Sequence, residues 1–203
     1  MEEFGKFEER VVLVGVQTDD HDNVEESLDE LKELASTAGA VTVGRIIQNR
    51  ESVHPGTYIG KGKIEEVRAL VYAMDATGII CDDELSPAQL NNLERELDCK
   101  VMDRTLLILD IFAARAITSE GKIQVELAQL RYRSARLVGL RESLSRLGGG
   151  IGTRGPGEKK LETDRRLIRT RISALKQELS QVEKHRELIR SSRARGNMKT
   201  AAI

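Results

Sequence analysis

Short apolar runs alternate with helical patterns over the first half of the chain. Four runs rich in β-branched residues predict buried strands, at 11–16, 40–47, 78–81 and 100–102. Three stretches with apolar residues at helical spacing lie between them, at about 24–38, 61–76 and 87–97. The last of these opens on Ser86, a good helix cap, and Pro87, which suits a first helical position. We therefore predict the α/β class, as a small open parallel four-stranded sheet with helices on both faces.

The second half of the chain reads as helix almost throughout. Residues 103–116 predict a bridging helix whose Leu106, Leu107, Ile111 and Phe112 pack on a neighbour. A long helix follows over about 119–147. Beyond it, apolar residues recur at every seventh position, as Leu161, Ile168, Leu175, Val182 and Ile189. A heptad after a short connection predicts a long antiparallel two-helix coiled-coil hairpin.

Between the two long helices lies a glycine-rich stretch, predicted as the tip of the hairpin at 148–158. It holds six glycines: Gly148, Gly149, Gly150, Gly152, Gly155 and Gly157. A turn needs only two or three residues, so this number predicts a backbone that another molecule approaches closely. A plain hairpin turn is the competing interpretation. The stretch is not a nucleotide phosphate loop, because Pro156 and Gly157 stand where Lys and Ser or Thr are required.

The net charge of −1 conceals two halves of opposite sign. Residues 1–117 carry 12 Lys and Arg against 24 Asp and Glu, whereas residues 118–203 carry 20 against 9. A basic helical half predicts a polyanionic partner, whose phosphates arginines bind without reading sequence. The arginines concerned are Arg131, Arg133, Arg136, Arg141, Arg146, Arg165, Arg166, Arg169 and Arg171. A coiled-coil interaction module that binds an acidic protein is an alternative.

Other features favour weaker hypotheses. The segment Gly60–Lys63 ahead of a helix, with the acidic loops after 11–16 and 78–81, suits a nucleotide-binding or nucleotide-hydrolysing α/β domain with Mg²⁺. Cys81 and Cys99 are expected to be buried reduced thiols, which favours a cytoplasmic protein. No apolar run is long enough to span a membrane, and the start lacks the form of a signal peptide.

Four segments resemble the HflX family of ribosome-associated GTPases. They are GGGIGTRGPGEKKLETDRR from Gly148, IGKGK from Ile59, DDELSPAQLNNLE from Asp82 and DRTLLILDIFAARA from Asp103. Many members have Thr-Gln where this chain has Lys159-Lys160. The resemblance implies an α/β subdomain, a helical hairpin and then a GTPase domain, which binds GTP and Mg²⁺ and begins with the strand started by Ala201–Ile203. GTP hydrolysis is therefore not expected from this chain alone.

The resemblance also implies partners and a site. Proteins similar to this one bind the large ribosomal subunit and its rRNA, with the hairpin tip near the peptidyl transferase region, and can split ribosomes under stress. We expect domains at 1–117, 118–197 and 198–203, no membrane partner, and no catalytic or metal-binding residue in this chain. The expected RNA-binding residues are Gly149, Gly150, Gly152, Thr153, Arg154, Gly155, Gly157, Lys159, Lys160, Arg146, Arg141, Arg165, Arg166 and Arg169.

Overall fold

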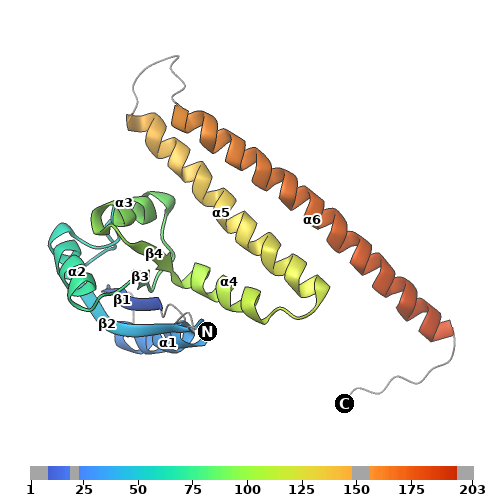
Figure 1. Ribbon diagram of the computed structural model, residues 1–203, viewed down its shortest axis with the longest axis horizontal. Coiled ribbons are helices and arrows are strands. Elements are labelled where there is room, and N and C mark those ends of the chain that lie inside the picture. Colours follow the sequence, from blue (N-terminus) through green and yellow to red (C-terminus); the bar gives the residue numbers. More distant parts are fainter. Residues whose placement is uncertain (1–8, 19–22, 148–155, 196–203) are drawn as a thin grey trace, which may run out of the picture. The chain divides into compact units, whose positions relative to one another are not determined.

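The computed structural model describes residues 9–18, 23–147 and 156–195, with only the backbone described at 138–147, 156–161 and 194 (Figure 1). Ten helices and strands lie in these ranges: β1 (Glu9–Gln17), α1 (Val24–Thr37), β2 (Ala40–Asn49), α2 (Lys61–Ala73), β3 (Gly78–Cys81), α3 (Pro87–Leu97), β4 (Lys100–Asp103), α4 (Arg104–Arg115), α5 (Ser119–Leu147) and α6 (Pro156–Arg195).

The chain divides into two compact units. The α/β unit comprises Met1–Arg115 and Ala135–Thr153, and the helical unit comprises Ala116–Ser134 and Arg154–Ile203. The long helix α5 therefore contributes its first half to one unit and its second half to the other. The expected domain limits, at 117/118 and 197/198, stay predictions.

The four strands of the α/β unit form one parallel sheet in the order β2-β1-β3-β4, which confirms the predicted fold class. The chain runs outward from β1 to β2 and then returns to the other side of β1 for β3 and β4. The strand order thus reverses between β1 and β3. In open sheets of this kind, ligands bind at the carboxyl ends of the strands beside such a reversal.

Helices cover both faces of the sheet, as the alternation of side chains on β1 requires. Val12, Val14 and Val16 pack in the core with residues of α2 and α3. Val11 and Leu13 point to the opposite face, where α1 and α4 cover the sheet. The six-residue run of β1 is therefore apolar throughout because both of its faces are buried.

The start of α3 confirms the cap that its sequence predicts. The Ser86 hydroxyl accepts a hydrogen bond from the Gln89 backbone amide, and the Gln89 side chain accepts one from the Ser86 amide. Pro87 occupies the first helical position, where its missing N–H is no loss. This reciprocal capping box fixes where the chain turns from the loop after β3 into α3.

In the helical unit, α5 and α6 pack side by side in opposite directions (Figure 1). Arg171 bonds Glu126, and Arg186, further along α6, bonds Glu120, nearer the start of α5. The buried centre of this contact comprises three side chains, Ile123, Leu127 and Leu175. Ile172, Leu179 and Val182 pack around them, so part of the predicted heptad seam lies where it is expected.

Three details of the helical half differ from the sequence-based expectation. Helix α6 begins at Pro156, inside the stretch predicted as a tip, because proline is well placed as a first helical residue. Ile189 is 39% exposed, although it continues the heptad, since Arg186 already lies opposite Glu120 near the first residue of α5. Phe112 is 57% exposed rather than packed, whereas Leu107 and Ile111 of the same helix are buried.

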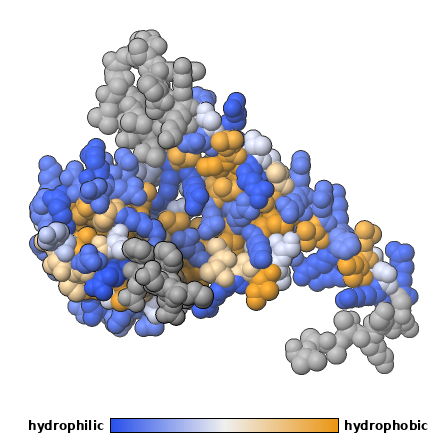
Figure 2. All heavy atoms as spheres, in the orientation of Figure 1, coloured by the Kyte–Doolittle hydropathy of each residue, from blue (hydrophilic) through white to orange (hydrophobic). Residues whose placement is uncertain are grey.

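Hydrophobic side chains form the buried core, and some also lie on the surface. On the face shown in Figure 2, hydrophilic side chains cover most of the surface, and hydrophobic ones emerge in patches along the helices. Leu167 and Leu188 of α6 are among the exposed apolar residues. In the part of the chain that the structure describes, no helix combines the length and apolarity needed to cross a membrane.

Truncation of Leu175 is expected to destabilise the packing of α5 against α6. Its side chain is 1% exposed, so Leu175→Ala should lower the free energy of unfolding by about 2–5 kcal/mol through lost burial and a residual cavity. Leu188→Ala removes the same atoms from an exposed site of the same helix and should cost less than about 0.5 kcal/mol. Urea denaturation followed by far-ultraviolet circular dichroism measures both. Equal costs would contradict the packing described here.

The thiol of Cys81 is expected to resist modification in the native protein. Burial raises the pKa of Cys81 well above its usual value, and the neighbouring Asp103 raises it further. The reactive thiolate is therefore scarce at neutral pH, in addition to being sterically covered. Iodoacetamide followed by mass spectrometry should label the half-buried Cys99 first, and both cysteines only in urea. Native labelling of Cys81 at the urea rate would contradict this burial.

Candidate nucleic-acid interface

Exposed cationic side chains lie along both helices of the helical unit. They are Arg131 and Arg133 of α5, and Arg166, Arg169 and Lys176 of α6. None of the five forms a side-chain hydrogen bond or an ion pair with another described residue. A solvated coiled-coil surface usually pairs opposite charges across and along its helices. These five charges are thus available to an anionic partner.

The three cations of α6 lie on one side of the helix. Arg166 and Arg169 are three residues apart, and Lys176 follows Arg169 by seven. Residues three, four or seven apart share a helix face, so the stripe extends over roughly 15 Å at 1.5 Å per residue. A row of cations at this spacing can contact successive phosphates of a nucleic-acid strand.

Two other arginines that the sequence assigns to phosphate binding have internal partners instead. Arg171 donates two hydrogen bonds to the Glu126 carboxylate, at 2.7 and 2.9 Å, and that bonding raises its pKa. Arg136 pairs with the buried carboxylate of Asp103. Neither pairing can be read from the sequence, because each acid lies far from its arginine along the chain and only the fold brings the two together.

The remaining predicted site residues are described to different degrees. Arg165 is half-buried, and its Nε has no hydrogen-bond partner among the described residues. Five residues are placed by backbone alone, in helices α5 and α6: Arg141, Arg146, Gly157, Lys159 and Lys160. Six lie outside the described residues: Gly149, Gly150, Gly152, Thr153, Arg154 and Gly155.

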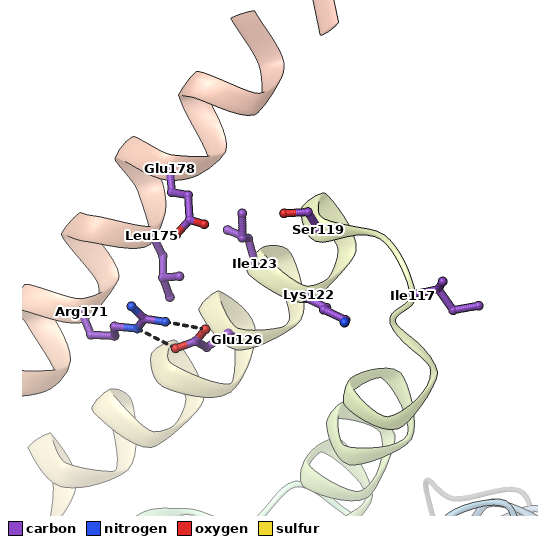
Figure 3. A pocket seen from close by; sticks show the side chains of 8 residues that line it. All are labelled: Ile117, Ser119, Lys122, Ile123, Glu126, Arg171, Leu175 and Glu178. Atoms are coloured by element: carbon purple, nitrogen blue, oxygen red, sulfur yellow. Dashed lines mark hydrogen bonds and ion pairs between the residues drawn. The ribbon is translucent and has the colours of Figure 1, made fainter. Parts of the chain in front are cut away.

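A cavity of about 440 Å³ opens between α5 and α6 in the helical unit (Figure 3). Ile123 and Leu175 form its apolar wall, with the Arg171–Glu126 pair beside them. Its other lining residues are Ile117, Ser119, Lys122 and Glu178. Two cations and two anions therefore balance around this cavity, so it lacks the excess of positive charge that distinguishes the exposed stripe.

The acidic loop after β3 is engaged by neighbouring side chains, whereas residues 19–22 of the acidic loop after β1 lie outside the described residues. After β3, Asp82 accepts a hydrogen bond of 2.8 Å from Arg104, and Asp83 accepts one of 2.7 Å from the buried Tyr58 hydroxyl. Burial, together with the negative charges nearby, raises the pKa of Tyr58, so this hydroxyl remains a donor. Among the described residues, no group of three or more His, Cys, Asp or Glu side chains is arranged to hold a metal ion.

The glycine-lysine segment lies at the start of α2, as the nucleotide hypothesis requires. Gly60 is the N-cap residue, and its amide donates to the Gln48 side chain at 2.8 Å. Lys63 pairs with Glu66 one turn along the same helix, at 2.6 Å. One of the two lysines is thus already paired within α2.

Asp103, which the sequence pattern does not single out, is a structural centre of the α/β unit. This last residue of β4 is completely buried, and its two carboxylate oxygens accept hydrogen bonds from the amides of Leu106 and Leu85, at 2.9 and 3.0 Å. The bond to Leu106 caps the start of α4. The position of Asp103 between a predicted strand and a predicted helix could have indicated its capping role. Nothing in the sequence indicates that Arg136 of α5 is its partner.

Comparison with known proteins relates the whole chain to one family. Residues 25–113 match a family described as the GTP-binding GTPase N-terminal region, and residues 115–193 match the GTP-binding GTPase middle region. A GTPase HflX of Lacrimispora saccharolytica is 68% identical over 201 residues, which cover 99% of this chain and 48% of that protein. For GTPase HflX of Escherichia coli K12, identity is 48% over 196 residues, 96% of this chain and 46% of that protein.

Solved structures share the fold. A complex of SsGBP with GDP has a TM-score of 0.64 at 23% identity, over 88% of this chain and 45% of that one. A GTP-binding protein of Sulfolobus solfataricus in complex with GDP has a TM-score of 0.60 at 22% identity, over 86% of this chain and 46% of that one.

This chain spans about half the length of the curated relatives that it matches. Its matches to the N-terminal and middle regions follow each other without overlap and extend from α1 into the last turn of α6. The fold and the sequence relationships agree: the chain belongs to the HflX family of GTPases.

Proposed function

We propose that this chain is the rRNA-binding region of an HflX-like GTPase and that it binds the large ribosomal subunit. The observation that carries the proposal is the set of exposed, unpaired cations on α5 and α6 described above. They belong to a region, residues 118–203, with 20 Lys and Arg against 9 Asp and Glu. Such a surface binds a phosphate backbone by releasing counterions, which needs no base-specific contact.

In this proposal the glycine-rich stretch at 148–158 enters the rRNA, and the flanking arginines hold phosphates. GTP and Mg²⁺ are bound by a GTPase domain that follows this chain, and the α/β unit supports the RNA-binding helices. In the complete protein, binding to the large subunit serves to split or rescue stalled ribosomes in the cytoplasm. The relatives named above are themselves GTPases, which supports the assignment of GTP to the protein as a whole.

Removal of the α6 stripe is expected to weaken binding in a salt-dependent way. Arg166→Ala with Arg169→Ala should lower the affinity for purified large ribosomal subunits about tenfold at low salt, because two phosphate contacts are lost. The slope of log affinity against log salt should fall by about two units, at roughly 0.9 per contact or somewhat less on single strands. Cosedimentation over a series of KCl concentrations measures both quantities.

A matched control is available on the same pair of helices. The double variant Arg171→Ala with Glu126→Ala also removes two side chains but leaves the net charge unchanged, because these residues bond each other. It should keep the salt slope of the unmodified chain. Equal losses for both double variants would count against rRNA binding by the stripe. Binding that rRNA fragments fail to compete would instead favour an acidic protein partner.

The glycine-rich stretch is tested through its cations. Arg154→Ala together with Lys159→Ala and Lys160→Ala should weaken binding to large subunits by a larger factor at low salt than at high salt, since three charges and their counterion release are removed. Lys184→Ala, on an exposed part of α6 distant in sequence, controls for the loss of charge alone. Unchanged cosedimentation of the triple variant would remove this stretch from the proposed site.

A further inference from the structure

Internal side chains bond the carboxyl ends of β3 and β4, at the edge where open α/β sheets usually bind their ligands. Three of the carboxylates that follow β3 or end β4 have a partner within the α/β unit. Asp82 bonds Arg104, Asp83 bonds Tyr58, and Asp103 bonds Arg136. Arg104 comes from the neighbouring helix α4, whereas Arg136 comes from α5, 33 residues beyond Asp103.

The site that receives Arg136 is built by three elements. Asp103 ends β4, Leu85 lies in the loop after β3, and Leu106 lies in the first turn of α4. The Leu85 and Leu106 amides donate to the carboxylate of Asp103, which is 0% exposed. The Arg136 guanidinium donates to that carboxylate and also to the Leu85 carbonyl, at 3.3 Å. It thus supplies the positive charge that the buried carboxylate requires.

The surroundings of Arg136 separate it from the exposed cations of the helical unit. Its side chain is 12% exposed, and its charge also acts on Glu94 of α3. Burial raises the pKa of Glu94, and the guanidinium opposes that rise. Residues 135–147 of α5 are grouped with the α/β unit. Within this segment, Arg136 bonds the buried carboxylate of Asp103.

We propose that Arg136 is a positioning residue for rRNA binding, which acts by holding the second half of α5 on the carboxyl edge of the sheet. The inference rests on the function proposed above and adds a role that requires no contact with RNA. A helix fixed before binding loses little conformational freedom on binding, whereas a loose one must be ordered at the expense of affinity. The carboxyl edge of the sheet, where such folds usually bind a ligand, thus binds helix α5 of the same chain.

Three variants test this role. Arg136→Met removes the charge and retains much of the aliphatic length, but it leaves Asp103 buried without its cation. Asp103→Asn with Arg136→Met removes both charges, and the asparagine oxygen still accepts from the Leu106 amide. Arg136→Lys keeps the charge and loses the planar fork. The last two variants keep the test decisive if the first one fails to fold.

Two measurements are made on each variant. Hydrogen–deuterium exchange of the amides in 135–147 reports whether α5 is held, and cosedimentation with large ribosomal subunits over a KCl series reports affinity and salt slope. The double variant should show faster exchange and about tenfold weaker binding. In this variant α5 becomes ordered only on binding, and the conformational entropy that it then loses lowers the affinity. Its salt slope should not change, since no phosphate contact is lost. Arg136→Lys should fall between this variant and the unmodified chain.

Other results would overturn the inference. A salt slope lowered by about one unit would mean that Arg136 contacts a phosphate. Faster exchange with unchanged affinity would show that holding α5 does not matter for binding, and unchanged exchange would show that Arg136 does not hold it. Failure of the proposed function is distinguished by the unmodified chain: if it does not bind large subunits, rRNA binding fails, and the exchange measurement still tests the contact to Asp103.

Discussion

A fully buried carboxylate constrains the arrangement of the α/β unit. A charge without solvent costs several kcal/mol unless donors and an opposite charge surround it. At Asp103 the donors come from the loop after β3, the first turn of α4 and the middle of α5. These three segments must therefore converge at one end of β4. The same requirement explains why residues of α5 join a unit that otherwise ends at Arg115.

The pattern of apolar residues was sufficient to predict the sheet. The run 11–16 was assigned to a strand buried on both faces, and its side chains do pack alternately into the two layers. Ser86 and Pro87 located the start of α3 correctly because their signal is local. Strand order could not be derived, since the connections from β1 permit more than one order. It depends on which edge each crossover returns to.

The arginines of α5 and α6 show what a linear pattern omits. Arg131, Arg133 and Arg136 look equivalent in sequence, yet the first two are exposed and the third is buried against Asp103. A helix turns each successive residue by a fixed angle, so neighbours in sequence face different surroundings. Which face is buried depends on a partner distant in the chain. The exposure of Ile189 has a related cause, because a heptad predicts a seam but not the length of the helix opposite.

The double burial of β1 has a consequence for how the α/β unit unfolds. Val12, Val14 and Val16 belong to one hydrophobic layer, whereas Val11 and Leu13 belong to the other. Neither layer can open while the other stays intact, because the strand between them would have to leave both. The sheet and its four helices therefore form one cooperative folding unit, whereas the smaller cluster around Leu175 permits α5 and α6 to separate in a local opening.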